Sequence, residues 1–191
     1  TAKATKVDLD WELGIGGGYS VAGNDVIVSL ANKATMKLAH YTKKGTSWSR
    51  SEMDFDDKNE HVSLNAIADD ASKIVYTYST ASKLPQYFVA DLKKNKVSNE
   101  KIFTALNKKL EKKYMPKSEI ITWTGYNGDE VTGILYYPNN YQEGKKYPLM
   151  LNIHGGPSSQ DTDEWSGSWA YYPSILVQKN MFVLMPNYHG S

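Results

Sequence analysis

Short apolar runs, separated by polar turn residues, recur along roughly the first hundred residues. Runs of about four to eight residues that are bounded by Gly, Asn, Asp or Ser are typical of β-strands. The pattern predicts strands, in chain order, at 19–21, 26–30, 36–41, 62–67, 74–78, 87–92 and 101–103. A longer loop through Pro85 is expected between the fifth and sixth of them. This regular spacing indicates a β-sandwich or the blades of a β-propeller.

The strands fall into two groups, near residues 17–55 and 61–104. A propeller typically needs about four to eight blades to close, so two groups do not complete a ring. Periodicity by itself leaves an irregular antiparallel sheet domain as the alternative. We therefore expect either two propeller blades or such a sheet domain.

The character of the chain changes at residues 106–118, which are rich in lysine and contain one glutamate. This composition is typical of a solvated connector. Beyond it, strand-like runs at 119–124 and 130–137 flank Asn127-Gly128, a strong signal for a β-hairpin turn. The pattern predicts two domains, one over residues 1–117 and the other over 118–191.

A different alternation follows in the second half of the chain. An apolar run at 149–153 and another at 181–186 flank a predicted helix at 169–178, where Pro173 requires a late start or a kink. Strand, helix and strand at this spacing predict a βαβ unit. The two strands should be parallel and buried on both faces, so that the fold class is all-β followed by α/β.

The overall charge and the residue types exclude several classes of function. A net charge of +1 offers no electrostatic basis for binding nucleic acid or an anionic membrane, and apolar runs of about six residues are too short to span a bilayer. The absence of Cys excludes disulfides, thiolate catalysis and Cys-ligated metals. The four His residues are scattered and no His-Glu-x-x-His occurs, so we expect no metal site.

Glycines at the end of the first predicted parallel strand are the main candidates for chemistry. Gly155 and Gly156 follow that strand, and the second strand ends at Asn187-Tyr188-His189-Gly190-Ser191. Bare main-chain N–H groups at such a position can stabilise the oxyanion of an acyl-transfer intermediate. A plain strand-to-helix turn is the alternative that the local pattern leaves open.

Two further segments are less informative. The run from Gly14 to Gly18 lacks the third glycine of a phosphate loop and is expected to be a turn. The segment from Asp54 to Glu60 lacks the glycine and the final glutamate of a calcium loop, so we expect an exposed acidic loop.

Residues 119–191 resemble the start of the catalytic domain in the prolyl oligopeptidase family of serine peptidases. The resemblance is carried, in order, by Glu119-Ile120, Asn127-Gly128, Gly133-Ile134-Leu135-Tyr136-Tyr137-Pro138, Lys146-Tyr147-Pro148, His154-Gly155-Gly156-Pro157 and Asn187-Tyr188-His189-Gly190-Ser191. The upstream half is similar, more loosely, to the closing blades of the family's β-propeller. The resemblance implies the last blades of a propeller followed by the N-terminal part of an α/β-hydrolase domain.

Roles for individual residues follow from this resemblance. His-Gly-Gly-Pro suggests the acylaminoacyl-peptidase and dipeptidyl-peptidase branches, with Gly155 and Gly156 in the oxyanion hole and the N–H of Gly156 as the donor. His154 and Pro157 would shape the loop. His189 stands where the family usually has Arg, which puts in doubt the contacts that the Arg would make. The implied substrates are short peptides, which the propeller would select by restricting access, and no cofactor is implied.

The nucleophile of such an enzyme is not found in the sequence. No Gly-x-Ser-x-Gly occurs in these 191 residues, although an α/β-hydrolase needs this motif and then Asp or Glu and His downstream. We expect a chain truncated before the catalytic serine, inactive by itself, in which the triad lies downstream. A carboxylesterase on the same fold and a non-catalytic propeller binding module with a degenerate hydrolase domain are the alternatives.

Location and assembly are weakly constrained. The N-terminus has neither an initiator Met nor the apolar core of a signal peptide, which indicates an internal start. The compartment is not determined by the residues, and family analogy alone favours a periplasmic or secreted location. Partners other than short peptides are not expected, neither nucleic acid nor membrane, and a homo-oligomer is left open.

Overall fold

The structure is a computed structural model that describes all of the chain except residues 1–5, 111–112, 114, 157 and 168–172. It divides into two compact units. The first comprises Thr1–Asn32, Met36–Tyr78 and Gln86–Ala105, and the second comprises Lys33–Thr35, Ser79–Pro85 and Leu106–Ser191. The lysine-rich connector and two short turn segments therefore group with the second unit.

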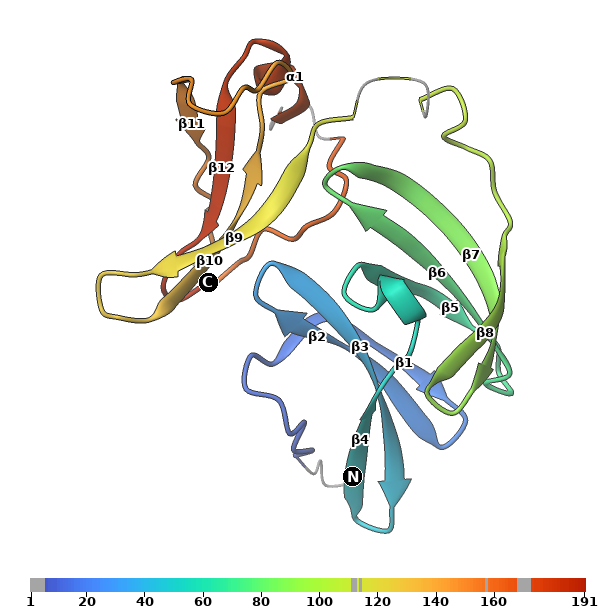
Figure 1. Cartoon of the computed structure of the whole chain (residues 1–191). Coiled ribbons are helices and arrows are strands. Elements are labelled where there is room, and N and C mark those ends of the chain that lie inside the picture. Colours follow the sequence, from blue (N-terminus) through green and yellow to red (C-terminus); the bar gives the residue numbers. More distant parts are fainter. Residues whose placement is uncertain (1–5, 111–112, 114, 157, 168–172) are drawn as a thin grey trace. The chain divides into compact units, whose positions relative to one another are not determined.

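The first unit is built on two four-stranded sheets with consecutive strand order (Figure 1). One sheet contains β1 (Ile15–Ala22), β2 (Asp25–Asn32), β3 (Thr35–Lys44) and β4 (Ser47–Glu52). The other contains β5 (Val62–Ile67), β6 (Lys73–Thr80), β7 (Lys83–Lys93) and β8 (Lys96–Ile102). Between them lies the short 3₁₀ turn η1 (Asp56–Lys58). Both predicted groups of strands are therefore confirmed as sheets. Sheets of four sequential antiparallel strands are also the repeating unit of β-propellers.

An aromatic cluster forms the main core of the first unit. Tyr76 on β6 stacks on Phe88 of β7, with ring centroids 5.2 Å apart, and Phe55 meets Tyr76 edge-on at 4.9 Å. The phenol of Tyr76 donates a hydrogen bond to the Glu100 carboxylate. Burial, followed by this bond to Glu100, raises the pKa of the Tyr76 phenol far above its ordinary value. Aromatic pairs of this geometry contribute about 0.5–1.5 kcal/mol beyond the area that they bury.

Three sequence predictions in this unit were wrong in detail. Strand β4 was missed because Trp48 is the only large apolar residue of Ser47–Glu52. Pro85 lies inside β7 and not in a loop; β7 first pairs with β8 at Phe88, so the missing N–H of Pro85 costs no hydrogen bond to β8. Gly16–Gly18 belong to β1 and not to a turn, and the register of β1 against β2 shifts between Ile15 and Gly18.

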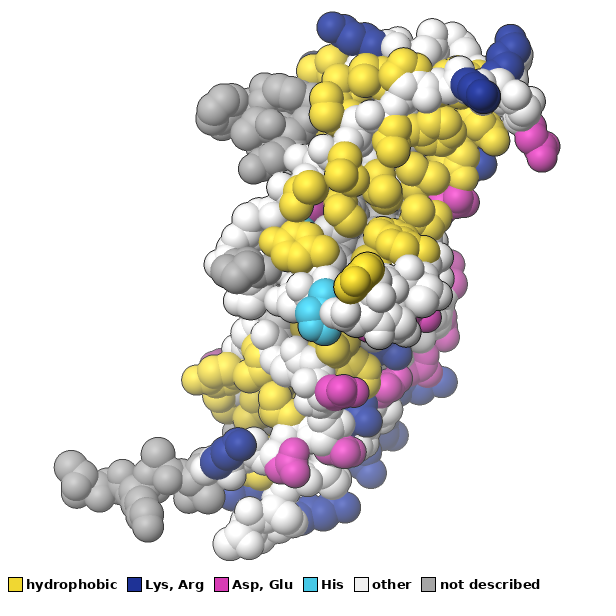
Figure 2. Space-filling view, turned by 90° about the vertical axis from the view of Figure 1, so that its left-hand side faces the viewer, with side chains coloured by type: hydrophobic (Ala, Val, Ile, Leu, Met, Phe, Trp, Pro, Cys, Tyr) yellow, Lys and Arg dark blue, Asp and Glu magenta, His cyan; other side chains and the backbone are white. Residues whose placement is uncertain are grey.

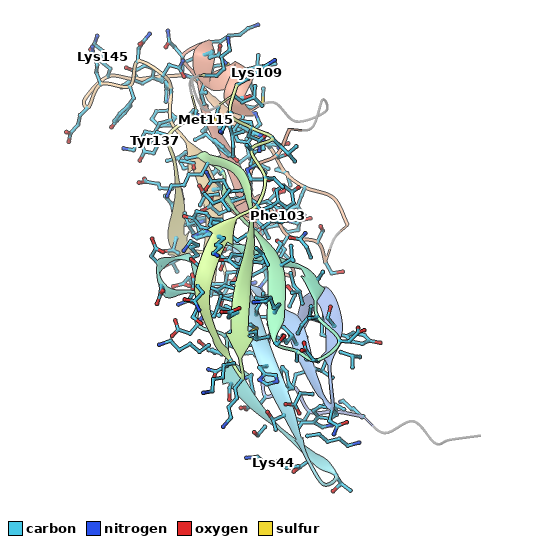
Figure 3. All side chains as sticks on the ribbon, turned by 90° about the vertical axis from the view of Figure 1, so that its right-hand side faces the viewer. Lys44, Phe103, Lys109, Met115, Tyr137 and Lys145 are labelled. Atoms are coloured by element: carbon cyan, nitrogen blue, oxygen red, sulfur yellow. The ribbon has the colours of Figure 1, made fainter. Side chains whose placement is uncertain are left out.

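Strand pairing continues just past β8. The N–H of Phe103 donates to the carbonyl of Tyr87 at 3.1 Å, and the two rings meet edge-on. Figure 3 labels Phe103, which lies just past the end of β8.

The second unit is built on one mixed sheet and a short helix. Its strands are β9 (Ser118–Thr124), β10 (Glu130–Tyr136), β11 (Leu149–Leu151) and β12 (Phe182–Asn187), in the spatial order β11-β12-β10-β9. Strands β11 and β12 are parallel, while β10 runs antiparallel to β9 and β12. The helix α1 (Pro173–Gln178) connects to β12. The predicted hairpin and the parallel pair are confirmed, and the described part of the helix predicted at 169–178 is helical from Pro173 to Gln178.

The tight turn between β9 and β10 follows from its sequence. Gly128 has a φ of +83°, which side-chain-bearing residues adopt rarely. Its N–H donates to the carbonyl of Gly125, and the N–H of Gly125 donates to the carbonyl of Asp129. These bonds set the register that pairs Thr124 with Glu130.

The expected burial of both parallel strands was wrong for β11. Leu149, Leu151 and Ile153 are 55%, 49% and 59% exposed. Strand β11 is the edge of the sheet among the described strands, so it has a hydrogen-bonded neighbour only on its β12 side. Figure 2 shows hydrophobic side chains gathered in the upper part of the face that it presents. Monomeric soluble proteins rarely expose a large continuous apolar surface.

The core of the second unit lies on the other strands. It consists of Ala34, Ala81, Ile134, Tyr136, Val177 and Val183. Ala34 and Ala81 come from the two turn segments that belong to this unit. The N–H of Asp163 donates to the carbonyl of Ala34 at 2.7 Å, and its carboxylate accepts the N–H of Ala81 at 2.8 Å. The two turns are therefore integral to the core of this unit.

Candidate functional site

The His154-Gly155-Gly156 loop begins where β11 ends. The N–H of Asn152 still donates to the carbonyl of Leu184 on β12, at 2.8 Å, so the parallel pairing reaches one residue past the strand. After that the chain leaves the sheet. The loop consequently starts at the carboxyl end of a parallel strand, where ligands bind in open α/β sheets.

Gly155 and Gly156 have different surroundings. Both are exposed, and a Cβ added at Gly155 would find no described atom within 4 Å. Gly156 has a φ of +138°, and a Cβ there would lie 2.8 Å from the Cβ of Ser159. The backbone at 156 thus requires glycine, because both its conformation and its space exclude a side chain. Pro157, predicted to shape this loop, lies outside the described residues.

His154 is held on both ring nitrogens. Its Nδ1 lies 3.0 Å from the carbonyl oxygen of Gly155, and its Nε2 lies 3.2 Å from the hydroxyl of Ser191. A carbonyl oxygen only accepts, so Nδ1 carries the proton, and in the neutral ring Nε2 accepts from Ser191. The ring of His154 also stacks on Tyr188, with centroids 4.6 Å apart and planes 19° from parallel.

The second glycine-bearing motif supplies the partners of this loop. Asn187, the last residue of β12, is buried, and its side-chain oxygen accepts the N–H of Asp161 at 2.7 Å. The side-chain nitrogen of Asn187 donates to the carbonyl of Asp161 at 2.9 Å. The phenol of Tyr188 donates to the carbonyl of His154 at 3.0 Å. Two motifs more than thirty residues apart in sequence therefore meet in one place.

A cavity of about 330 Å³ lies beside the loop. Its lining residues come from β10, from the segment 152–166 and from β12, and they are mostly polar. They are Tyr136, Asn152, His154, Gly155, Ser159, Gln160, Asp161, Thr162, Glu164, Ser166 and Met185. Open space therefore adjoins the main chain at Gly155, as an oxyanion-binding loop requires.

Two titratable groups that line the cavity have raised pKa values. Burial raises the pKa of Asp161 above its ordinary value, and the neighbouring His154 opposes this shift. The Oδ2 atom of Asp161 is buried and has no hydrogen-bond partner among the described residues. Burial also raises the pKa of the Tyr136 phenol, and the charges of Asp163, Asp161 and Glu164 add to that shift. Burial is the largest cause of both shifts.

His189, at the position where the resemblance noted above has Arg, has a partner of its own. Its Nδ1 lies 3.1 Å from a carboxylate oxygen of Asp129 in the β9–β10 turn. The His189 side chain is largely exposed. Exposed pairs of this kind contribute at most about 1 kcal/mol.

Sequence reasoning missed the parts of Asn187, Tyr188 and Asp161 in this site. Asn187 and Tyr188 were noted only as parts of a motif, and Asp161 was not singled out. The available signal in the sequence was the position of an Asn at the end of an apolar run, because an Asn that is buried there needs hydrogen-bond partners for its amide. Its partner in the loop 26 residues earlier follows only from the three-dimensional structure.

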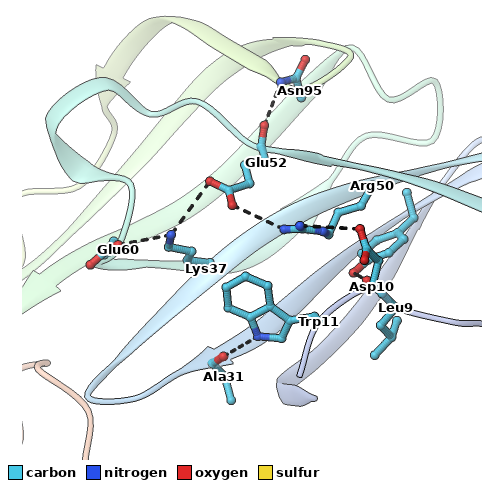
Figure 4. Close-up of polar contacts among 10 residues, drawn as sticks. Leu9, Asp10, Trp11, Ala31, Lys37, Arg50, Glu52, Glu60 and Asn95 are labelled. Atoms are coloured by element: carbon cyan, nitrogen blue, oxygen red, sulfur yellow. Dashed lines mark hydrogen bonds and ion pairs between the residues drawn. The ribbon is translucent and has the colours of Figure 1, made fainter. Parts of the chain in front are cut away.

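A second polar cluster, in the first unit, consists of paired side chains (Figure 4). Lys37 pairs with Glu60 at 3.4 Å, and Arg50 pairs with Glu52 at 3.4 Å. Both cations lie near the ring of Trp11, whose indole N–H donates to the carbonyl of Ala31 at 2.6 Å. These contacts fasten the N-terminal segment to its sheet and explain the cluster without a ligand.

Within the described part of the chain, no group of three or more His, Asp or Glu side chains could hold a metal ion. The segment from Asp54 to Glu60, considered above for calcium, contains η1, where Lys58 pairs with Asp57 and Glu100. The described helix is also neither long nor apolar enough to cross a membrane.

Comparison with known proteins gives the wider context. No family model matches the chain. The chain is 36% identical over 75 residues to a protein of Aspergillus flavus called probable dipeptidyl-peptidase 5, a match that covers 38% of this chain and 10% of that protein. It is 38% identical over 64 residues to dipeptidyl-peptidase 5 of Porphyromonas endodontalis, covering 34% and 9%.

Solved structures match over more of the chain. An acylaminoacyl peptidase in complex with Z-Gly-Gly-Phe-chloromethyl ketone superposes with a TM-score of 0.65 at 16% identity, over 90% of this chain and 24% of that one. At this identity the likeness establishes the fold, and the sheets match the propeller domain of such structures. The sequence matches span about a tenth of the curated relatives' length, and the structural match spans 24% of the acylaminoacyl peptidase chain. Over about a third of its length in sequence, and over most of its length in fold, the chain is therefore similar to peptidases of the prolyl oligopeptidase family.

Proposed function

We propose that these residues are part of a serine peptidase that hydrolyses short peptides through an acyl-enzyme. Residues 118–191 would form the N-terminal part of its α/β-hydrolase domain, and residues 1–117 would contribute propeller blades. The loop at Gly155 and Gly156 would supply an oxyanion donor, while the catalytic serine, acid and histidine would lie on residues outside this sequence. No cofactor is needed, because the nucleophile and a general base suffice for acyl transfer.

One observation carries this proposal: the glycine loop at the carboxyl end of β11 is open to a cavity. Gly155 lines that cavity, and the conformation of Gly156 excludes a side chain. Backbone N–H groups held in place before the reaction stabilise developing negative charge without reorganising. Losing one such donor typically costs on the order of 3 kcal/mol of barrier.

The contact between Ser191 and His154 does not replace the missing triad. A Ser hydroxyl within reach of a His ring is the first part of a nucleophile–base pair. In a triad, however, a third group orients the other ring nitrogen. Here that nitrogen, Nδ1, bonds to the carbonyl of Gly155, the next residue in the chain. We therefore assign His154 to shaping the loop and not to proton transfer.

Fluorophosphonate labelling tests this proposal. We expect the longer protein that contains these residues to be labelled on a serine downstream of Ser191, and the 191-residue chain to remain unlabelled. Labelling of Ser191 in the 191-residue chain would overturn the assignment of His154. A longer protein that carries no reactive serine would instead be a binding module.

A substrate panel separates peptidase from esterase activity. We expect the longer protein to release dipeptides or acylated residues from unmodified peptides, with the Ser→Ala variant of the labelled serine as control. Hydrolysis of simple esters without cleavage of any peptide would identify a carboxylesterase.

A further inference from the structure

We propose that Tyr188 is a positioning residue, and that with Asn187 it holds the His154–Asp161 loop in the geometry that oxyanion binding requires. This inference rests on the proposed function and adds to it a role for the second glycine-bearing motif. Neither residue would touch the substrate. Each would act through the main chain of the loop.

The first anchor is at His154. The phenol of Tyr188 donates to the His154 carbonyl at 3.0 Å, and its ring stacks on the imidazole at 4.6 Å. The peptide unit that holds this carbonyl also holds the N–H of Gly155. A hydrogen bond to the carbonyl therefore fixes the plane of that peptide and the direction of its N–H, because the peptide group is rigid. Ser191 adds a bond to the same imidazole.

The second anchor is at Asp161. The side chain of Asn187 engages both the N–H and the carbonyl of Asp161, at 2.7 and 2.9 Å. Asn187 is buried and belongs to β12, so its position is set by the sheet. A buried amide that uses its acceptor and one of its donors on the same residue fixes that residue in direction as well as in distance.

Gly155 and Gly156 lie between these anchors and are themselves exposed. Fixing both ends of the segment reduces the number of conformations that its middle can adopt. Preorganisation matters here because a misplacement of about 1 Å at a reacting group can cost on the order of 100-fold in rate. Two residues that never meet the substrate would thus determine whether the glycine N–H groups point into the cavity.

The kinetic test uses Tyr188→Phe in the longer protein. This variant keeps the ring stack and removes the bond to the His154 carbonyl. We expect kcat to fall on the order of 10-fold to 100-fold with KM little changed, because the loss is confined to the transition state. Tyr126→Phe is the matched control, since Tyr126 is fully exposed in the β9–β10 turn, and it should leave both constants unchanged. An unchanged kcat for Tyr188→Phe, with or without a lower melting temperature, would show a purely structural role and overturn the proposal.

A second measurement is independent of catalysis. In the 191-residue chain, ¹⁵N relaxation should show ordered amides at Gly155 and Gly156, with order parameters near about 0.85. Tyr188→Phe should lower them toward about 0.6, while Tyr126→Phe should not. If the longer protein hydrolyses nothing, the proposed function fails, and these amides still decide whether Tyr188 holds the loop. Equal order parameters in all three chains would overturn the anchoring itself.

Discussion

The sheet β5–β8 and the sheet β9–β12 have the same number of strands but different burial. In the first, Ile74, Tyr76 and Phe88 are buried in one aromatic core. In the second, the edge strand β11 is as apolar in sequence, yet each of its three residues is exposed. Apolar sequence alone therefore does not predict burial, because a strand also needs neighbours that cover its faces.

The two regions also differ in where their contacts originate. The first unit has a core that combines residues of both of its sheets, and Trp11 packs against cations of the same unit. The second unit depends on residues far away in sequence: Ala34 and Ala81 complete its core, and the N–H of Trp165 donates to the hydroxyl of Ser79 at 2.9 Å.

The largest effect is expected from a cavity in the aromatic core. Ile74→Ala removes three carbons from a residue that is completely buried. A loss of about 3 kcal/mol is typical for such a change. Hydrogen exchange should show faster opening of β5–β8 amides, while β9–β12 amides remain as in the parent chain. Equal acceleration in both sheets would contradict their description as separate compact units.

The next effect contrasts the two loop glycines. Gly156→Ala forces a side chain into a φ of +138° and against Ser159, so we expect a cost of about 1–3 kcal/mol for the native loop. Gly155→Ala is the matched control and should cost less than about 0.5 kcal/mol. NMR shifts from 154 to 161 should move widely in the first variant only. Similar spectra for both variants would mean that the loop does not hold the backbone described here.

An intermediate effect is expected at Asp161. Burial raises its pKa in the folded chain, so the folded state binds more protons than the unfolded state above the ordinary value of 3.8. Stability is therefore lost as the pH rises from that value through the folded pKa. Asp161→Asn should be more stable than the parent at pH 7, by on the order of 1 kcal/mol, since a buried unpaired charge is removed.

The pH dependence provides the control for Asp161→Asn. The gain should shrink as the pH is lowered toward 4, where the parent carboxyl takes up its proton. Thermal unfolding of both chains from pH 4 to 7 measures this difference. A gain that is constant across the range would indicate a change in packing and not in charge.

The smallest effect is expected on β11. Leu151→Thr should change the stability of the 191-residue chain by less than about 0.5 kcal/mol, because Leu151 is half exposed. It should also reduce aggregation, measured by light scattering. If residues 118–191 are part of a larger hydrolase sheet, the same change in the longer protein should cost about 2 kcal/mol or more, because further strands would cover it. A small cost in both would contradict the hydrolase proposal.

Much of the local structure was predictable because it depends on neighbouring residues. Asn127-Gly128 predicts a tight turn, and the apolar runs at 149–153 and 181–186 predict a parallel pair, as the structure confirms. Strand β4 escaped detection because its alternation is nearly all polar. Pro85 misled because the strand interior usually excludes proline, although a position without a partner on its N–H side accepts it.

The candidate site was predictable only in part. The glycine loop could be found from its place after an apolar strand, and the carboxyl end of that strand indicates where a ligand would lie. The residues that hold the loop could not be found in this way, since the bond between Asn187 and Asp161 joins positions 26 residues apart. Nothing in the local spacing relates them.

The amino-acid sequence by itself determined most of the strands, the β9–β10 turn and the need for glycine in the loop, because each depends on propensity and backbone geometry within a few residues. The tertiary structure alone decided that β11 is exposed, that Ala34 and Ala81 complete a distant core, and that Tyr188 and Asn187 reach the loop. These features arise from contacts between remote segments, which only the packing of the folded chain brings within reach of each other.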